Sequence, residues 1–134
     1  MLSNSSKYAI KAVLHLALHS NEGRKLKAKD IASHTNVPLS YLSKLLQKLA
    51  KANKISSERG PHGGFYLKEE DKNQNLNDII EVLNTQRSIS TCALGFKECD
   101  QENKCSLHDI FSDSKKTLMT NLKSKSINEL INKI

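Results

Sequence analysis

The chain has 134 residues, of which 37% are hydrophobic and 4% aromatic, with no Trp. That size fits one domain with a modest core, to which a second copy would add buried surface. An odd number of cysteines, three, argues against a closed disulfide framework and suits a reducing compartment. The apolar stretch at 12–18 is too short for a membrane span and is interrupted by His15. No secretory signal is visible in the sequence. We therefore expect a cytoplasmic protein with no membrane partner.

The positive charge is concentrated in the first half of the chain, within a formal net charge of +7. Residues 1–70 carry 12 Lys and Arg against 5 Asp and Glu, a difference of +7. Residues 71–134 carry 9 of each kind, a difference of zero. A basic half joined to a neutral half indicates that the first half contacts a polyanion such as nucleic acid. The alternative is a solvated Lys-rich surface without such a partner.

Helical periodicity predicts three helices in the first half. The first covers 8–18, where apolar residues share one face and Ser and Asn residues able to cap the helix precede it. A second, short helix covers 27–33, and a turn at 34–37 separates it from the third. Pro38 suits the start of the third helix because its missing N–H costs nothing there. Two such helices joined by a short turn are typical of a helix-turn-helix.

The third predicted helix has an outward face without carboxylates. Its inward positions are Leu42, Leu45, Leu46 and Leu49. Its outward positions, with Tyr41 near the start, are Ser40, Ser43, Lys44, Gln47, Lys48 and Lys51. A helix in a DNA major groove avoids carboxylates because phosphates repel them, and Ser, Gln and Lys can bond base edges. The pattern favours DNA recognition over an ordinary surface helix, which usually mixes both charges.

A β-hairpin is predicted directly after the third helix. Two short β-like runs, 55–59 and 65–67, flank the turn Gly60-Pro61-His62-Gly63-Gly64. Glycines there allow the backbone to approach a phosphate or a narrow groove closely. Arg59 at the hairpin base could enter a minor groove, where negative potential attracts a guanidinium. The predicted fold class is therefore mostly α: a winged helix-turn-helix over 1–70, with the hairpin as a small wing.

The second half is predicted to supply a link, a cysteine loop and dimerisation helices. A linking helix falls within 71–91, a polar loop with all three cysteines covers 92–106, and helices follow over 107–134. The last helix opens with the capping-box pattern Ser126-Ile127-Asn128-Glu129. The longer helix before it has an apolar stripe that predicts a homodimer seam. The stripe consists of Leu107, Ile110, Phe111, Ser114, Leu118, Met119 and Leu122.

The cysteines form a candidate metal site with a nearby histidine. Cys92, Cys99 and Cys105 are followed three positions later by His108. Three thiolates and one imidazole suit an iron–sulfur cluster or zinc. The polar loop would hold a cluster near solvent, accessible to oxidants, to nitric oxide or to loss of iron. The alternatives are a structural zinc on the same ligands, a regulatory disulfide between two thiols, or no ligand at all.

Four segments in chain order resemble one family of bacterial regulators. They are Lys7-Tyr8-Ala9-Ile10-Lys11-Ala12, Leu39-Ser40-Tyr41-Leu42, Arg59-Gly60-Pro61-His62-Gly63-Gly64-Phe65 and the cysteine triad. Over essentially the whole chain they resemble the IscR/NsrR/CymR-type regulators, also called the BadM or Rrf-two family. The resemblance implies a homodimeric winged-helix transcription factor that binds a palindromic double-stranded DNA operator. The residues predicted to contact DNA are Ser40, Tyr41, Ser43, Lys44, Lys48, Arg59 and His62.

The same resemblance implies a particular cluster. Several members of the family carry an iron–sulfur cluster on three loop cysteines, and Cys92, Cys99 and Cys105 match those positions. In the IscR-like branch a histidine shortly after the third cysteine completes a [2Fe–2S] site, and His108 matches it. In the NsrR branch the fourth ligand is an Asp near the start of the partner's first helix, where this chain has Lys7. The resemblance thus favours [2Fe–2S] over [4Fe–4S], with His108 as fourth ligand.

Some features depart from the family or leave a second function open. Ser43 stands where the IscR branch has an acidic residue, and His62 where glycine is common, so the operator sequence is not implied. No third group that would orient a Cys/His pair is implied by order or spacing, so we expect a protein that is not an enzyme. A protein–protein adaptor would leave the basic helix unexplained. The alternative within the family is a cluster-free regulator that responds by thiol oxidation, a small ligand or a partner protein.

Overall fold

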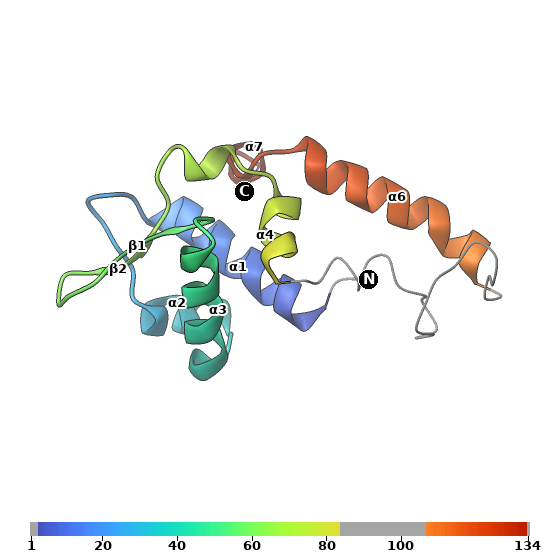
Figure 1. Cartoon of the computed structure of the whole chain (residues 1–134). Helices are drawn as coiled ribbons and strands as arrows, with labels where there is room; N and C mark the ends of the chain where they lie inside the picture. The colour runs from blue at the N-terminus through green and yellow to red at the C-terminus, as the bar shows by residue number, and fades with distance from the viewer. Residues whose placement is uncertain (1–2, 84–106, 134) are drawn as a thin grey trace.

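The computed structural model describes residues 3–83 and 107–133 of the chain (Figure 1). Its elements are α1 (Asn4–His19), α2 (Ala28–Thr35), α3 (Leu39–Lys51), β1 (Ser56–Glu58), β2 (Gly64–Tyr66), the 3₁₀ helix η1 (Asp71–Asn73), α4 (Leu76–Val82), α6 (His108–Ser124) and α7 (Ile127–Ile131). The described part is mostly helical, and its one sheet is the antiparallel pair β1–β2. This arrangement confirms the predicted winged helix-turn-helix fold class.

Local capping explains where the first three helices begin and end. α1 starts four residues before the apolar periodicity does, because the Ser3 hydroxyl accepts the Ser6 N–H at 3.1 Å and caps a polar first turn. α2 ends at Thr35, and Asn36 after it has a left-handed φ of 57°, which Asn tolerates at helix ends. Pro38 precedes α3, and its carbonyl accepts the Leu42 N–H at 2.9 Å.

One hydrophobic core joins the winged helix to the later helices. The four leucines predicted to face inward from α3 are all buried. They pack with α1, with Ile79 of α4 and with Ile127 of α7 in one cluster. The core residues of α1 are Ala9, Ala12, Val13, Leu16 and Ala17. The position of α3 is therefore set by packing on α1 and, through the same core, by α4 and α7.

The wing is a short hairpin anchored by a third chain segment. Ser56 pairs with Tyr66 and Glu58 with Gly64 across β1–β2. Leu26 adds a bridge to Phe65, with N–H···O=C distances of 2.9 and 2.7 Å in the two directions. A Cβ at Gly63 would lie 2.1 Å from the Glu58 carbonyl oxygen, so the turn closes only with glycine there.

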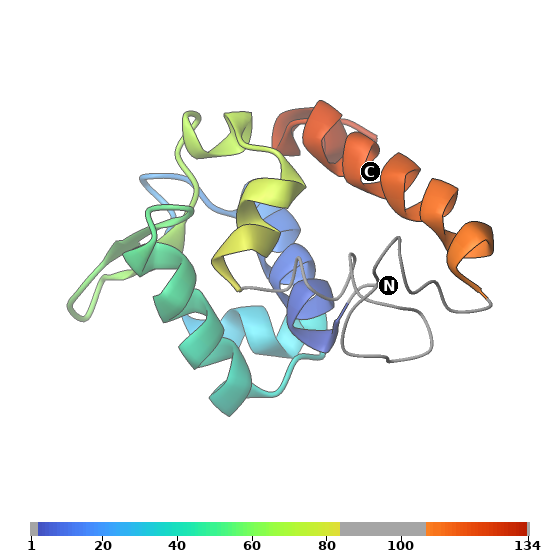
Figure 2. The ribbon, with the colours of Figure 1, turned by 45° about the vertical axis from the view of Figure 1, so that its right-hand side comes forward.

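In the second half, α4 and α7 pack on the core, and α6 between them in the chain extends away from it. Asn75 and Asp78 form a capping box at α4, with hydrogen bonds of 2.9 and 3.2 Å. The Ser126 hydroxyl accepts the Glu129 N–H at 3.2 Å, as its capping pattern predicts, and the Ile127 N–H donates to the Gln74 carbonyl at 2.8 Å. α6 packs against α4 and extends away from the remaining helices (Figure 2).

The apolar stripe of α6 is only partly covered by its own chain. None of the side chains described on this helix is buried. Ile110 is 65% exposed, and Leu122 reaches the edge of the core. Phe111, Leu118 and Met119 are half-buried, and Ser114 is exposed. A single copy of the chain therefore leaves apolar surface on α6 in contact with water.

Candidate nucleic-acid interface

The outward face of α3 is open to solvent and carries only positive charge. Ser40, Tyr41, Lys44, Gln47, Lys48 and Lys51 are exposed. Ser43 is also predicted to face outward, but its side chain is half-buried and therefore less accessible than the others. The helix has no Asp or Glu along its length, so phosphates would meet no repulsion from it.

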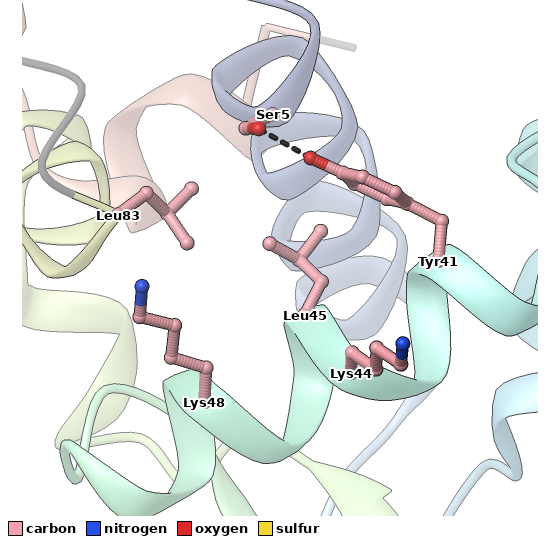
Figure 3. Close-up of a pocket in the computed structure, with 6 residues that line it drawn as sticks. All are labelled: Ser5, Tyr41, Lys44, Leu45, Lys48 and Leu83. Carbon is pink, nitrogen blue, oxygen red and sulfur yellow. Dashed lines mark hydrogen bonds between the residues drawn. The ribbon is translucent and has the colours of Figure 1, made fainter.

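Tyr41 has contacts that the sequence pattern did not reveal. Its ring packs edge-on against Tyr8, with ring centroids 5.4 Å apart and planes at 74°. Its hydroxyl is hydrogen-bonded to the Ser5 hydroxyl (Figure 3). These contacts tie the first turn of α3 to α1. Tyr41 therefore anchors the first turn of α3 on α1 while the residue stays 40% exposed.

A pocket of about 210 Å³ lies beside these contacts, between α1, α3 and the end of α4. We call it the Tyr41 pocket, and it is lined by Ser5, Tyr41, Lys44, Leu45, Lys48 and Leu83. In Figure 3 the side chain of Lys48 extends toward Leu83, opposite the hydrogen-bonded Ser5 and Tyr41. Two of the lysines predicted to contact DNA thus also border a hollow with apolar walls.

The turn of the wing presents polar and basic side chains to solvent. The Gly63 N–H donates to the Gly60 carbonyl at 3.0 Å and closes the turn. Arg59, Pro61 and His62 are exposed. In both ribbon views the hairpin and α3 lie at the end of the molecule away from α6 (Figures 1 and 2). The predicted contacts of the helix and of the wing therefore belong to one end of the protein.

An ion pair neutralises the end of β1 that adjoins the turn of the wing. Lys25 forms a salt bridge with Glu58, and its ammonium lies 5.4 Å from the centre of the Tyr66 ring. The hydrogen bond from Lys25 lowers the pKa of Glu58 and raises the pKa of Lys25, so both remain charged near neutral pH. The carboxylate of β1 is thereby paired, which limits its repulsion of a nearby phosphate.

The predicted metal ligands are only partly within the described residues. Cys92, Cys99 and Cys105 lie outside them. His108 is the first residue of α6, directly after that segment, and Lys7 is exposed on α1. Within residues 3–83 and 107–133, no group of three His, Cys, Asp or Glu side chains could hold a metal ion. The cysteine site therefore stays a prediction.

A second pocket of about 310 Å³ is lined by three histidines, His15, His19 and His34. The sequence pattern did not predict that they lie close together. The His15 ring centroid lies 4.6 Å from that of His19 and 5.3 Å from that of His34. His34 Nδ1 is 2.8 Å from the Asp30 carbonyl oxygen, and Arg24 also lines the pocket. Partial burial lowers the pKa of His15, and the two neighbouring imidazoles lower it further. The folded protein thus resists protonation of His15.

This resistance predicts a loss of stability in mild acid. The unfolded chain binds a proton at His15 near the ordinary pKa of 6.5 and the folded chain only at lower pH, so stability falls as pH drops below that value. His15→Gln should reduce the difference in unfolding temperature between about pH 7.5 and about pH 5. His62→Gln, which removes an exposed histidine of the wing, should leave that difference unchanged. Equal pH dependence of the wild type and His15→Gln would contradict the prediction.

A winged helix whose third helix carries no carboxylate is typical of DNA-binding transcriptional regulators. Comparison with known proteins agrees: the family model Rrf2, described as an iron-dependent transcriptional regulator, matches residues 2–133. The chain belongs to this family. The HTH-type transcriptional regulator IscR of Photorhabdus laumondii is 31% identical over 131 residues, which cover 98% of this chain and 79% of that protein. Because these relatives are regulators, the expectation that the protein is not an enzyme is confirmed.

Solved structures share the same fold. CymR, the global cysteine regulator of B. subtilis, superposes with a TM-score of 0.76 and 25% identity over 100% of this chain and 98% of that one. IscR of T. potens superposes with a TM-score of 0.71 and 24% identity over 99% and 87%. In the described part of the chain, no helix is long and apolar enough to cross a membrane.

Proposed function

We propose that the protein is a homodimeric regulator that reads a palindromic operator with α3 and the wing. The observation that carries this proposal is the exposed face of α3, which presents lysines and no carboxylate at the same end of the molecule as the wing. A recognition helix offers its first turns to base edges and its flanks to phosphates. The division into a winged helix over 1–70, a link over 71–91, a cysteine loop over 92–106 and dimerisation helices over 107–134 is part of the proposal.

The predicted contacts divide between bases and phosphates. Ser40 and Lys44, exposed one turn apart, can reach base edges in a major groove. Lys48 lies a turn further along and contacts phosphate. Ser43 contributes through its accessible part, and Tyr41 through its ring edge. In the wing, Arg59 enters the adjacent minor groove and His62 contacts the backbone.

Operator binding tests this assignment directly. Arg59→Ala should weaken binding to the specific operator by roughly 1–3 kcal/mol, because it removes a groove contact. Lys48→Ala should weaken binding to all sequences about equally and reduce the slope of log affinity against log salt by about one. Mobility-shift titrations with genomic fragments at several salt concentrations measure both effects. Unchanged binding by both variants would mean that the interface lies elsewhere.

Dimerisation is supported by the surface of α6. Ile110 is 65% exposed, and its neighbours on the stripe are only half-covered in a single chain. A second α6 related by a two-fold axis would cover this surface and place two recognition helices symmetrically. Two-fold symmetry of the protein matches a palindrome of the operator.

An operator-binding regulator acts where the DNA is, so the proposal places the protein in the cytoplasm.

The proposed sensor is an iron–sulfur cluster, [2Fe–2S] in preference to [4Fe–4S], on Cys92, Cys99, Cys105 and His108. The donor set fits, because thiolates are the usual protein ligands of such clusters and imidazole replaces thiolate in some [2Fe–2S] sites. Lys7 cannot act as a carboxylate ligand from α1, which favours His108. A bound cluster supplies redox chemistry and reactivity toward oxidants or nitric oxide. The four residues bind it and join it to α6, whose first residue is His108.

The position of the cysteine segment supports a regulatory role. It connects α4 to α6, which pack against each other, and α4 shares the core of α3 through Ile79. A change of ligation at His108 would act on the first turn of the dimerisation helix and thereby on the spacing of two recognition helices. The alternative is a cluster-free regulator that responds through its thiols. Similarity to CymR, described as a global cysteine regulator, favours that alternative as the second candidate.

A further inference from the structure

We propose that the Tyr41 pocket binds a small organic carboxylate and that this ligand weakens DNA binding by occupying lysines of the recognition helix. The inference rests on the proposed DNA interface for its second half. The pocket is formed by three elements that packing brings together, at the start of α1, along α3 and at the end of α4. It has both the charge and the apolar surface that such a ligand requires.

The charge of the lining selects an anion. Lys44 and Lys48 border the pocket, and no Asp or Glu is among its lining residues. A carboxylate there would accept charge-assisted hydrogen bonds from ammonium groups. The paired hydroxyls of Ser5 and Tyr41 add a neutral donor, since their mutual hydrogen bond uses one hydroxyl hydrogen and leaves the other free.

The apolar walls and the size select the rest of the ligand. Leu45 and Leu83 face the hollow from α3 and from the end of α4 (Figure 3). The volume of about 210 Å³ is smaller than the ~300–1,000 Å³ of sites for drug-sized molecules, so a ligand on the order of ten non-hydrogen atoms fits. A short aliphatic or aromatic monocarboxylate has this size and an apolar body. A DNA phosphodiester has no such body to place against the leucines.

Occupation of the pocket would oppose DNA binding. Lys44 and Lys48 are proposed contacts to the operator, and the ligand would hold the ammonium of Lys48, whose side chain extends toward Leu83 in Figure 3. Two ligands that use one set of cations weaken each other by the same factor, whichever binds first. The pocket therefore gives the regulator an input that does not pass through the cysteines.

Benzoate is the probe for this site, and benzyl alcohol is its neutral control. Titration of the full-length protein without DNA should shift the NMR signals of Tyr41 and Leu83 with benzoate and leave them in place with benzyl alcohol. At saturating benzoate, operator affinity at constant ionic strength should fall at least about fivefold. Absence of shifts at Tyr41 and Leu83 would overturn the site, and shifts without loss of operator affinity would overturn the competition.

A matched pair of variants separates the pocket from a general effect of anions. Lys48→Met removes a lysine of the lining, whereas Lys51→Met removes an exposed lysine one turn further along α3 and outside the pocket. Benzoate should bind Lys51→Met as it binds the wild type and should bind Lys48→Met at least about tenfold more weakly. Equal benzoate binding by the two variants would overturn the proposal. Because operator binding is measured separately without benzoate, failure of the DNA interface would be recognised independently.

Discussion

Gly63→Ala is expected to weaken operator binding by about 10- to 100-fold. The added Cβ would lie 2.1 Å from the Glu58 carbonyl oxygen, a backbone atom that cannot move without reshaping the turn. The whole turn, with Arg59 and His62, would then change its position. Mobility-shift titration measures the loss, and thermal unfolding should show a decrease of no more than about 5 °C, because the tip lies outside the core.

Gly23→Ala is the matched control for the wing. A Cβ at Gly23 would have only an ordinary contact, 3.4 Å from Asn21 Oδ1, and would meet no backbone atom of the hairpin. It should bind the operator like the wild type. Operator affinity of Gly63→Ala equal to that of this control would show that the wing makes no contact with DNA.

Ile110→Glu is expected to convert the dimer into a monomer and to reduce operator affinity by about 10²- to 10⁴-fold. The monomeric variant should still fold, because the Ile110 side chain is 65% exposed in a single copy of the chain. A carboxylate buried at a two-fold seam would face its own symmetry mate without a partner charge. Each half-site would then be bound by an independent chain rather than by two linked recognition helices. Sedimentation equilibrium reports the mass, and a titration with the palindromic operator reports the affinity.

Lys116→Glu places the same carboxylate on an exposed position of α6 away from the apolar stripe. This variant should remain dimeric. A dimer of Ile110→Glu with wild-type operator affinity would place the subunit contact on another surface.

Much of the fold follows from local patterns in the sequence. The helical spacing of Leu42, Leu45, Leu46 and Leu49 predicts their burial because a helix repeats its faces regularly, and all four are buried. The Gly-rich turn predicts the hairpin because few other residues tolerate so close a backbone approach. The cap at Ser126 also follows from its pattern.

Contacts between distant segments were not predictable in this way. Leu26 joins the wing through a single bridge to Phe65, which leaves no periodic signal. The Ser20 hydroxyl accepts the Leu67 N–H at 3.1 Å across 47 positions of the chain. Ser43 lies on the predicted outward face yet is half-buried, because a helical repeat does not show how much of each side chain the folded chain covers.

The candidate sites were likewise predictable from the sequence only in part. Exposure of Lys44, Lys48 and Arg59 agrees with the charge pattern. The Tyr41 pocket and the histidine pocket each combine residues from separate elements, and only tertiary packing unites them. Residue spacing cannot predict such sites, because it relates only residues within one helix or strand.

The central claim is that the cysteines and His108 hold an iron–sulfur cluster that controls a DNA-binding dimer. The most direct measurement is the iron and acid-labile sulfide content of the protein purified without oxygen, together with its visible absorption. The account predicts equal amounts, about two of each per chain, with visible absorption that Cys99→Ser abolishes. Protein that contains neither iron nor sulfide and shows no visible absorption under these conditions would contradict it.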